Sequence, residues 1–131
     1  MKLLLDTHVW VWTLEHPVRL SRGVRRQLED LRNERYLSPV SVWEARLLEN
    51  RGRLRLARGF SRWLADAFAA LPVVEAPINF AVGEEAAGIH LPQSDIGDVF
   101  LAATARVYDL TLVTADTQLL ACSWLRTLPA Y

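Results

Sequence analysis

The stretch that decides the fold is Lys2-Leu3-Leu4-Leu5-Asp6, a short apolar run that stops at a carboxylate. A second run, Leu110-Thr111-Leu112-Val113-Thr114-Ala115, stops in the same way at Asp116. If the two runs are neighbouring parallel strands, both aspartates emerge at one carboxyl edge, which is where open α/β sheets place their ligands. The sequence therefore predicts a parallel sheet with an acidic site at one edge.

Two further acidic residues, Glu44 and Asp98, lie near the starts of apolar stretches that are typical of helices. Like charges gathered in one crevice repel each other, and a hard divalent cation held by oxygen ligands is the usual compensation. Four converging carboxylates therefore predict a site for Mg²⁺ or Mn²⁺. The three histidines are far apart and include no i, i+4 pair, so a histidine-based zinc site is not expected.

The rest of the chain alternates short strands with helices. We expect strands at 3–5, 35–38, 73–75, 111–114 and 126–128, and helices within 9–14, 21–31, 41–48, 61–71, 79–88, 95–108 and 117–121. The expected N-caps of four helices are serines, namely Ser21, Ser41, Ser61 and Ser94. Such alternation implies right-handed crossovers and a parallel sheet covered on both faces. The expected fold class is α/β, a single three-layer α/β/α domain over residues 1–131 with a short, mainly parallel sheet of four or five strands.

The charge distribution is uneven although the net charge is zero, a value that argues against indiscriminate binding of nucleic acid. Six arginines fall within the 17 residues from Arg46 to Arg62, against only Glu44 and Glu49. Arginine forks onto phosphates better than lysine does, so the cluster suggests a phosphate-binding surface. The alternative is an arginine-rich codon usage combined with a solvated helix face.

Nothing in the sequence points to a membrane. No apolar run reaches the ~18 residues that a bilayer-spanning helix needs, and the start of the chain does not resemble a signal peptide. The lone Cys122 cannot form an intrachain disulfide, which fits a reducing cytoplasm. The glycine-rich loops that bind nucleotide phosphates are also missing from the sequence. We therefore expect a cytoplasmic protein without a nucleotide cofactor.

Each acid also has a purely structural interpretation. Asp6 is placed to cap the helix that follows it, and Asp116 to form an Asx-type turn. Asp95 and Asp98 share the first turn of one helix, where the macrodipole favours negative charge. On the residues alone, these roles and the metal site remain alternatives that do not exclude one another.

Glu44 has the strongest structural alternative. Ser41-Val42-Trp43-Glu44 matches the S-x-x-E capping box, in which the glutamate bonds back to the Ser41 backbone N–H. The residues alone favour this box, although a carboxylate in the first turn can also point past the helix end. Thr114, two positions before Asp116, is a candidate to hydrogen-bond a neighbouring carboxylate or a water of the metal.

Three segments resemble the PIN domain and, more narrowly, the VapC toxins of bacterial and archaeal type II toxin–antitoxin pairs. They are LLLDTHVWVW, SPVSVWEARLLENRGRL and DIGDVFLAATARVYDLTLVTAD, in the family's order and spacing over nearly the whole chain. The resemblance places the four acids of the family on Asp6, Glu44, Asp98 and Asp116, and its polar residue on Thr114. It therefore favours Glu44 as a ligand over Glu44 as a cap.

One segment departs from the family pattern. Many relatives that begin with D-T-H carry H-R-D-P-F-D-R, where this chain has residues 93–99, QSDIGDV. Asp95 and Asp98 are retained, but Ile96 replaces the proline and Val99 replaces the arginine. The metal acids are intact, whereas any substrate or antitoxin contact made by that arginine is in doubt.

The resemblance implies an endoribonuclease that depends on Mg²⁺ or Mn²⁺ and cleaves RNA phosphodiester bonds with metal-activated water. It implies that Asp6, Asp98 and Asp116 contact metal directly or through water, while Glu44 holds a second metal or helps to take the proton of the water. Asp95 and Thr114 would support this set. The implied partners are the RNA substrate, a VapB-like antitoxin and a second copy of the chain.

The arginine cluster would then bind the phosphates that flank the cleaved bond. The candidates for this contact are Arg46, Arg51, Arg53 and Arg55. Two other functions remain open, a catalytically silent RNA-binding or regulatory module and a DNA nuclease with the same metal chemistry. The four intact acids argue against the silent module, because an inactive relative would be expected to have lost at least one.

Overall fold

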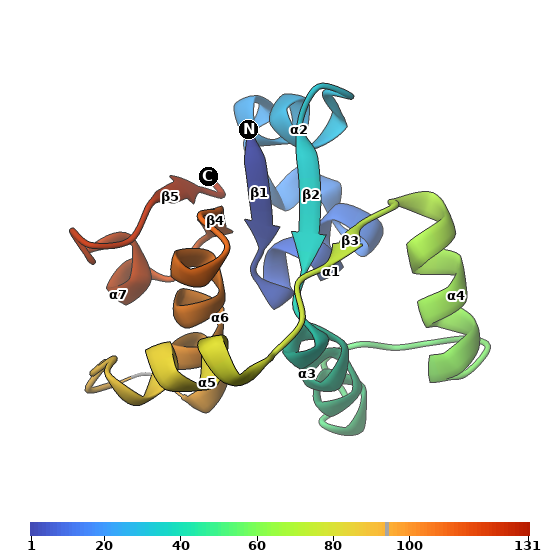
Figure 1. Cartoon of the computed structure of the whole chain (residues 1–131). Helices are drawn as coiled ribbons and strands as arrows, with labels where there is room; N and C mark the ends of the chain where they lie inside the picture. The colour runs from blue at the N-terminus through green and yellow to red at the C-terminus, as the bar shows by residue number, and fades with distance from the viewer. Residues whose placement is uncertain (94) are drawn as a thin grey trace.

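A computed structural model describes residues 1–93 and 95–131. In chain order the elements are β1 (Lys2–Leu5), α1 (Thr7–Glu15), η1 (Pro17–Arg19), α2 (Arg22–Glu29), β2 (Glu34–Leu37), α3 (Pro39–Asn50), α4 (Phe60–Ala70), β3 (Val74–Glu75), α5 (Phe80–Ala87), α6 (Ile96–Val107), β4 (Thr111–Thr114), α7 (Thr117–Leu120) and β5 (Thr127–Pro129). All five expected strands are present, and Figure 1 shows how the helices surround them.

The strands form one five-stranded sheet in the order β3-β2-β1-β4-β5, and every pair in it is parallel. The central strand β1 lies between β2 and β4, with Leu3 opposite both Arg35 and Thr111. The predicted α/β class and the adjacency of the two acid-terminated strands are therefore confirmed. Parallel neighbours bring the ends of β1 and β4 to the same edge, which places Asp6 next to the end of β4.

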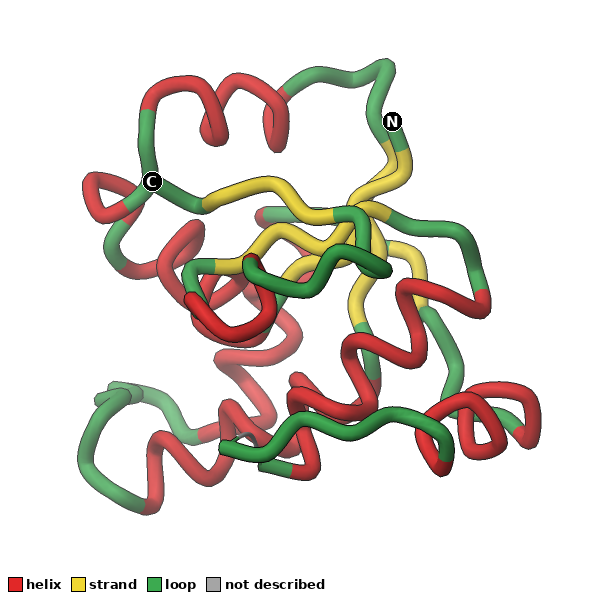
Figure 2. The backbone as a smooth tube through the Cα atoms, turned by 90° about the vertical axis from the view of Figure 1, so that its left-hand side faces the viewer, coloured by secondary structure: helices red, strands yellow, loops and turns green. Residues whose placement is uncertain are grey.

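The sheet is covered by helices on both faces, as Figure 2 shows for the strands between the helical layers. Leu3 and Leu5 pack in one core with residues of α1, α2 and α4, whereas Leu4 packs in a second core with residues of α6. All three leucines are fully buried. Successive side chains of a strand point to opposite faces, so this unbroken apolar run is what a two-sided sheet requires.

Three helices begin elsewhere than the serine pattern predicts. Ser21 caps α2 as expected, because its hydroxyl accepts the Val24 N–H at 3.1 Å. The cap of α3, however, is Ser38 rather than Ser41, with Pro39 as the first helical residue. Proline suits that position because its missing N–H would have no helical partner there. Ser41 therefore lies inside the first turn of α3, and the predicted helix start there is wrong.

The other differences are also local. The helix α4 is preceded by Gly59 at φ 83° and not capped by Ser61. The helix α6 is capped by Asp95, and the predicted cap Ser94 lies outside the described residues. The helix α2 ends at Glu29, so Leu31 is 92% exposed instead of completing its apolar stripe.

The position of α3 matters most for the site. It starts directly after β2 and contacts both α1 and α6, so it runs along the carboxyl edge of the sheet (Figure 1). Its residues belong to both cores, Val40 to one and Ala45 to the other. This placement points Glu44 towards the starts of α1 and α6. In the described part of the chain, no helix combines the length and apolarity needed to cross a membrane.

Candidate metal site at the carboxyl edge

Asp6 and Thr114 form the centre of the site. Leu5 and Val113 are paired across β1 and β4, so the residues that follow them emerge side by side. The Thr114 hydroxyl donates to Asp6 Oδ2 at 2.6 Å, and Asp6 is only 8% exposed. Asp6 stands at the N-cap position of α1 but makes no side-chain cap bond. Its carboxylate is therefore oriented by Thr114 and not by a cap bond to the helix.

Asp116 joins the same network from the loop after β4. Its backbone N–H donates to Thr114 Oγ1 at 3.1 Å. Its Oδ1 accepts the N–H groups of Gln118 at 2.8 Å and Leu119 at 3.1 Å, which makes Asp116 the N-cap of α7. The structural interpretation of Asp116 is thus confirmed, but both cap bonds use Oδ1. The cap fixes the orientation of the carboxylate and leaves Oδ2 for a ligand.

Glu44 does not form the predicted capping box. Its Oε1 lies 2.7 Å from Thr7 Oγ1, which lies 2.8 Å from the hydroxyl of the buried Ser41. A hydroxyl has one proton to donate, so Thr7 donates to the carboxylate and Ser41 donates to Thr7. The box fails because Ser41 is already inside the helix, where its backbone N–H bonds to Ser38 O. Glu44 consequently turns towards α1 and the acidic edge.

Gly97 provides the space that Glu44 occupies. A Cβ atom built on Gly97 would stand 2.5 Å from Glu44 Oε2 and 2.8 Å from Glu44 Cδ, which is closer than real Cβ atoms come. Neither Gly97 nor Thr7 is among the site residues predicted from the sequence. A glycine in the first turn of a helix costs about 0.5–1 kcal/mol relative to alanine, and such a cost is a signal of close packing.

Asp98 is the acid most affected by its surroundings. Burial raises its pKa to about 7, and the negative charges of Asp95, Asp6, Asp116 and Glu44 raise it in the same direction. Asp95, the cap of α6, accepts the Asp98 N–H at 3.0 Å and stands in the same turn. The negative charges of all the other predicted acids therefore reach Asp98.

The pKa values of Asp6 and Glu44 are raised in the same way as that of Asp98. Burial raises the pKa of Asp6, against the Thr114 hydrogen bond and the charge of His8, which lower it. Burial also raises the pKa of Glu44, against the hydrogen bond from Thr7. In the described part of the chain none of these carboxylates forms an ion pair with Arg or Lys. The protein thus holds uncompensated negative charge at this edge.

The donor set suits a hard cation bound partly through water. As the side chains stand, no three His, Cys, Asp or Glu residues of the described chain are close enough to coordinate one ion directly. Mg²⁺ keeps several waters and binds proteins through one or two carboxylates. Oxygen donors that are anionic, coupled and partly buried fit such a cation, with the other acids acting through its waters.

A hollow of about 450 Å³ opens beside Glu44. Its lining combines acids, arginines and apolar side chains: Thr7, His8, Trp43, Glu44, Leu47, Leu48, Arg51, Arg53, Asp95, Ile96 and Gly97. Two of the four candidate RNA-binding arginines, Arg51 and Arg53, are therefore at the site. Arg46 instead pairs with Glu49 and lies over the Phe60 ring, and Arg55 is exposed without lining the hollow.

Residue 99, where relatives carry an arginine, plays no part in this hollow. Val99 is partly buried and packs against the apolar residues of α5 and α6. Asp95 and Asp98 nevertheless flank Gly97 in the turn that approaches Glu44. Val99 therefore belongs to the packing between α5 and α6 and lies outside the hollow.

Comparisons with known proteins agree with the observed fold. The sequence profile described as the PIN domain matches residues 3–124. DNA-bound VapBC from Salmonella typhimurium shares the fold with TM-score 0.73 and 14% identity, over 100% of this chain and 99% of that one. VapBC2 from Rickettsia felis, bound to a promoter DNA fragment, gives 0.63 and 20% over 98% of each chain. FitAcB from Neisseria gonorrhoeae gives 0.62 and 24% over 96% of each chain. Comparison with the sequences of curated proteins finds no match.

Proposed function

Because this chain belongs to the PIN domain family, we propose that it is a metal-dependent endoribonuclease and the toxin of a VapBC-type toxin–antitoxin pair. The observation that supports this most is the gathering of unpaired carboxylates around Asp98 at the carboxyl edge, beside a hollow that two arginines line. Carboxylates with a purely structural role are usually paired with a cationic side chain. Here a metal cation would bind the carboxylates, and a phosphate would bind the two arginines.

Four carboxylates would hold the metal and handle the proton. Asp6, Asp98 and Asp116 would bind Mg²⁺ or Mn²⁺ directly or through water, and the bound cation would stabilise charge on the phosphate and activate the attacking water. Glu44, held by Thr7 and confined by Gly97, is placed to accept the proton of that water or to bind a second cation. Attack in line with the leaving 3′ oxygen leaves a 5′ phosphate and a 3′ hydroxyl.

The chemistry is tested by incubating the purified protein with a structured RNA in Mg²⁺, in Mn²⁺ and in EDTA. We expect fragments with 5′ phosphates in the two metals and intact RNA in EDTA. A DNA of the same sequence, in parallel, separates a ribonuclease from a DNA nuclease. Intact RNA in both metals, from a protein that is folded by circular dichroism, would refute the proposal.

The partner would be an antitoxin segment that lies in the hollow. Trp43 and Ile96 are exposed apolar side chains of its wall, and Glu44 and Asp95 supply negative charge. An apolar segment carrying an arginine would cover the wall and form charge-assisted bonds to the acids, in competition with metal. Such a toxin would act in the cytoplasm and as a homodimer, so light scattering that shows only a ~15 kDa monomer at micromolar concentration would contradict the dimer.

The genetic context gives an independent test. A small reading frame next to this gene, encoding a DNA-binding N-terminal part and a disordered tail, would be the antitoxin. Co-expression should yield a complex in which cleavage is inhibited, and Trp43→Ala should weaken that inhibition more than cleavage itself.

A further inference from the structure

The arginines of this protein divide into paired and unpaired groups. In the described chain, five arginines form ion pairs and Arg35 donates to two backbone carbonyls. The remaining arginines, which have no acidic partner, lie in two stretches, 19–26 and 51–58. The second stretch reaches the hollow through Arg51 and Arg53. The first stretch is not explained by the metal site, the hollow or the core.

The first stretch is connected to the site by a row of aromatic rings. The ring of Trp12 lies 5.9 Å from that of His8 and 6.2 Å from that of Tyr131, the latter in a stacked arrangement at 27°. Arg19 places its guanidinium carbon 5.4 Å from the centre of the Trp12 ring. His8 and Trp12 are one turn apart on α1, and His8 itself lines the hollow. We refer to His8, Trp12, Tyr131 and Arg19 as the aromatic row.

The aromatic row lies at the same edge of the sheet as the acids. Pro129 pairs with Thr114, and the Ala130 N–H donates to Thr114 O at 2.9 Å, so Tyr131 follows β5 just beyond that edge. Tyr131 is 70% exposed, and His8 and Arg19 are exposed as well. Trp12 is partly buried and packs against the core that contains Leu3 and Leu5, so it holds the row in place while the rings of His8 and Tyr131 stay exposed.

We propose that the aromatic row binds unpaired nucleotides of the RNA on one side of the cleaved phosphate, with bases stacked on Tyr131 and His8 and a phosphate on Arg19. This inference rests on the proposed ribonuclease function. Every base has a flat π-face, so exposed rings beside a cation form a sequence-tolerant platform for single strands. The bases of a duplex are stacked on each other and cannot use it. Arg51 and Arg53 would then hold the strand on the other side of the acids.

The test measures binding to a short single-stranded RNA and to its blunt duplex in an Asp116→Asn background. Tyr131→Ala should weaken binding of the single strand about tenfold and leave duplex binding unchanged, whereas Tyr131→Phe should bind as the background does. Phe80→Ala is the matched control, because Phe80 is another exposed aromatic residue, on α5. Arg19→Gln should reduce the salt dependence of binding by a slope of about 0.7, which is one phosphate contact on a single strand.

A second measurement identifies the base that stacks. The measurement uses a series of RNAs that each lack one base. For one RNA of this series, the Asp116→Asn protein and its Tyr131→Ala variant should bind with equal affinity, because the missing base and the missing ring remove the same contact. Equal affinities for Tyr131→Ala, Phe80→Ala and the background would overturn the inference. So would a Tyr131→Ala protein that changes its oligomeric state but not its RNA affinity, since the row would then be a contact between copies.

The two proposals fail in different ways. If the parent protein cleaves RNA and Tyr131→Ala changes neither affinity nor cleavage, the aromatic row is refuted and the ribonuclease stands. If the parent neither binds nor cleaves any RNA in Mg²⁺ or Mn²⁺, both are refuted.

Discussion

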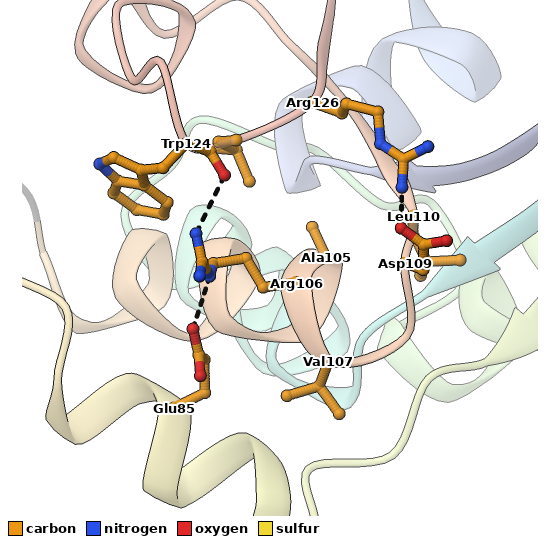
Figure 3. Close-up of a pocket in the computed structure, with 9 residues that line it drawn as sticks. Glu85, Ala105, Arg106, Val107, Asp109, Leu110, Trp124 and Arg126 are labelled. Carbon is orange, nitrogen blue, oxygen red and sulfur yellow. Dashed lines mark hydrogen bonds and ion pairs between the residues drawn. The ribbon is translucent and has the colours of Figure 1, made fainter.

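The two ends of the sheet differ in how their charged side chains are paired. At the amino ends of β4 and β5, a hollow of about 340 Å³ contains Arg106 and Arg126, and each has its own carboxylate (Figure 3). Arg106 bonds to Glu85 at 2.5 Å and to the Trp124 carbonyl at 3.0 Å, and Arg126 pairs with Asp109. At the carboxyl ends, the other acids raise the pKa of Asp98, and none of the acids forms an ion pair with Arg or Lys within the described chain. Both arginines of the first hollow are thus paired, whereas the carboxylates of the opposite edge have no ion pair among the described residues.

The physical consequence of this difference is unequal sensitivity to mutation. Exposed ion pairs such as those at the amino end contribute about 0–1 kcal/mol, because water already solvates both charges well. Carboxylates that repel one another lower stability until a cation binds. Changes at the amino end should therefore be nearly silent, and changes at the carboxyl end should alter function and raise the stability of the metal-free protein.

The largest expected effect comes from removing one carboxylate. Asp98→Asn, or Asp6→Asn, should reduce RNA cleavage at least ~100-fold, because the cation loses a ligand or an ordered water. The melting temperature in metal-free buffer should rise, since one repelling charge is gone. Arg126→Gln at the amino end is the control and should cleave normally. Cleavage by Asp98→Asn at the parent rate in low Mg²⁺ would remove Asp98 from the site.

The next effect concerns the space around Glu44. Gly97→Ala places a methyl group against the Glu44 carboxylate, so that side chain must move and cleavage should fall about tenfold. Gly83→Ala is a matched control, because Gly83 is also helical and its added Cβ meets nothing within 4 Å. Circular dichroism should show both variants folded. Equal activity of the two would mean that the orientation of Glu44 is unimportant.

A smaller effect is expected from the arginines of the hollow. Replacing Arg51, Arg53 and Arg55 by Gln should weaken RNA binding several-fold and lower the salt slope by about 0.7 for each lost phosphate contact. Because only Arg51 and Arg53 line the hollow, the double variant should reproduce the triple one. The measurement is a salt titration in the Asp116→Asn background, with Arg32→Gln, an arginine paired with Asp30, as control. An unchanged salt dependence of binding would mean that these arginines do not contact RNA.

The smallest effect is a pH dependence of stability in EDTA. Burial and the neighbouring acids raise the pKa of Asp98 from its ordinary value of 3.8 to about 7 in the folded protein, so between these pH values the folded state holds a proton that the unfolded state has lost. Protonated Asp98 therefore favours the folded state. This contribution to the free energy of unfolding is fully present below about pH 4 and is lost as the pH rises towards 7. The melting temperature should therefore be about 2–5 °C lower at pH 8 than at pH 5.5. Asp98→Asn should flatten this dependence, and Mg²⁺ at pH 8 should restore stability; a flat profile for the parent would contradict it.

Much of the fold and of the candidate site could be predicted from local patterns. Apolar runs ending in Asp6 and Asp116 identify strands and their common edge, because burial on two faces demands such runs. The helix starts were less predictable. Ser38 and Ser41 are both suitable caps, and only the proline after Ser38 favours the first of them. The orientation of Glu44 was not predictable, because Thr7 and Gly97, which control it, are distant in sequence.

Local sequence is enough to predict which side chains could be ligands and at which edge they would meet, because the position of an acid after a buried strand is a local property. Which charges are balanced depends instead on tertiary packing. Arg46 and Arg51 are alike in sequence, yet one pairs with Glu49 and the other lines the hollow. Likewise, Trp12 and Tyr131 meet only because β5 returns to the edge where α1 begins. Such partners are brought together by the packing of segments that are distant in sequence, and a local sequence pattern does not show which distant segments will meet.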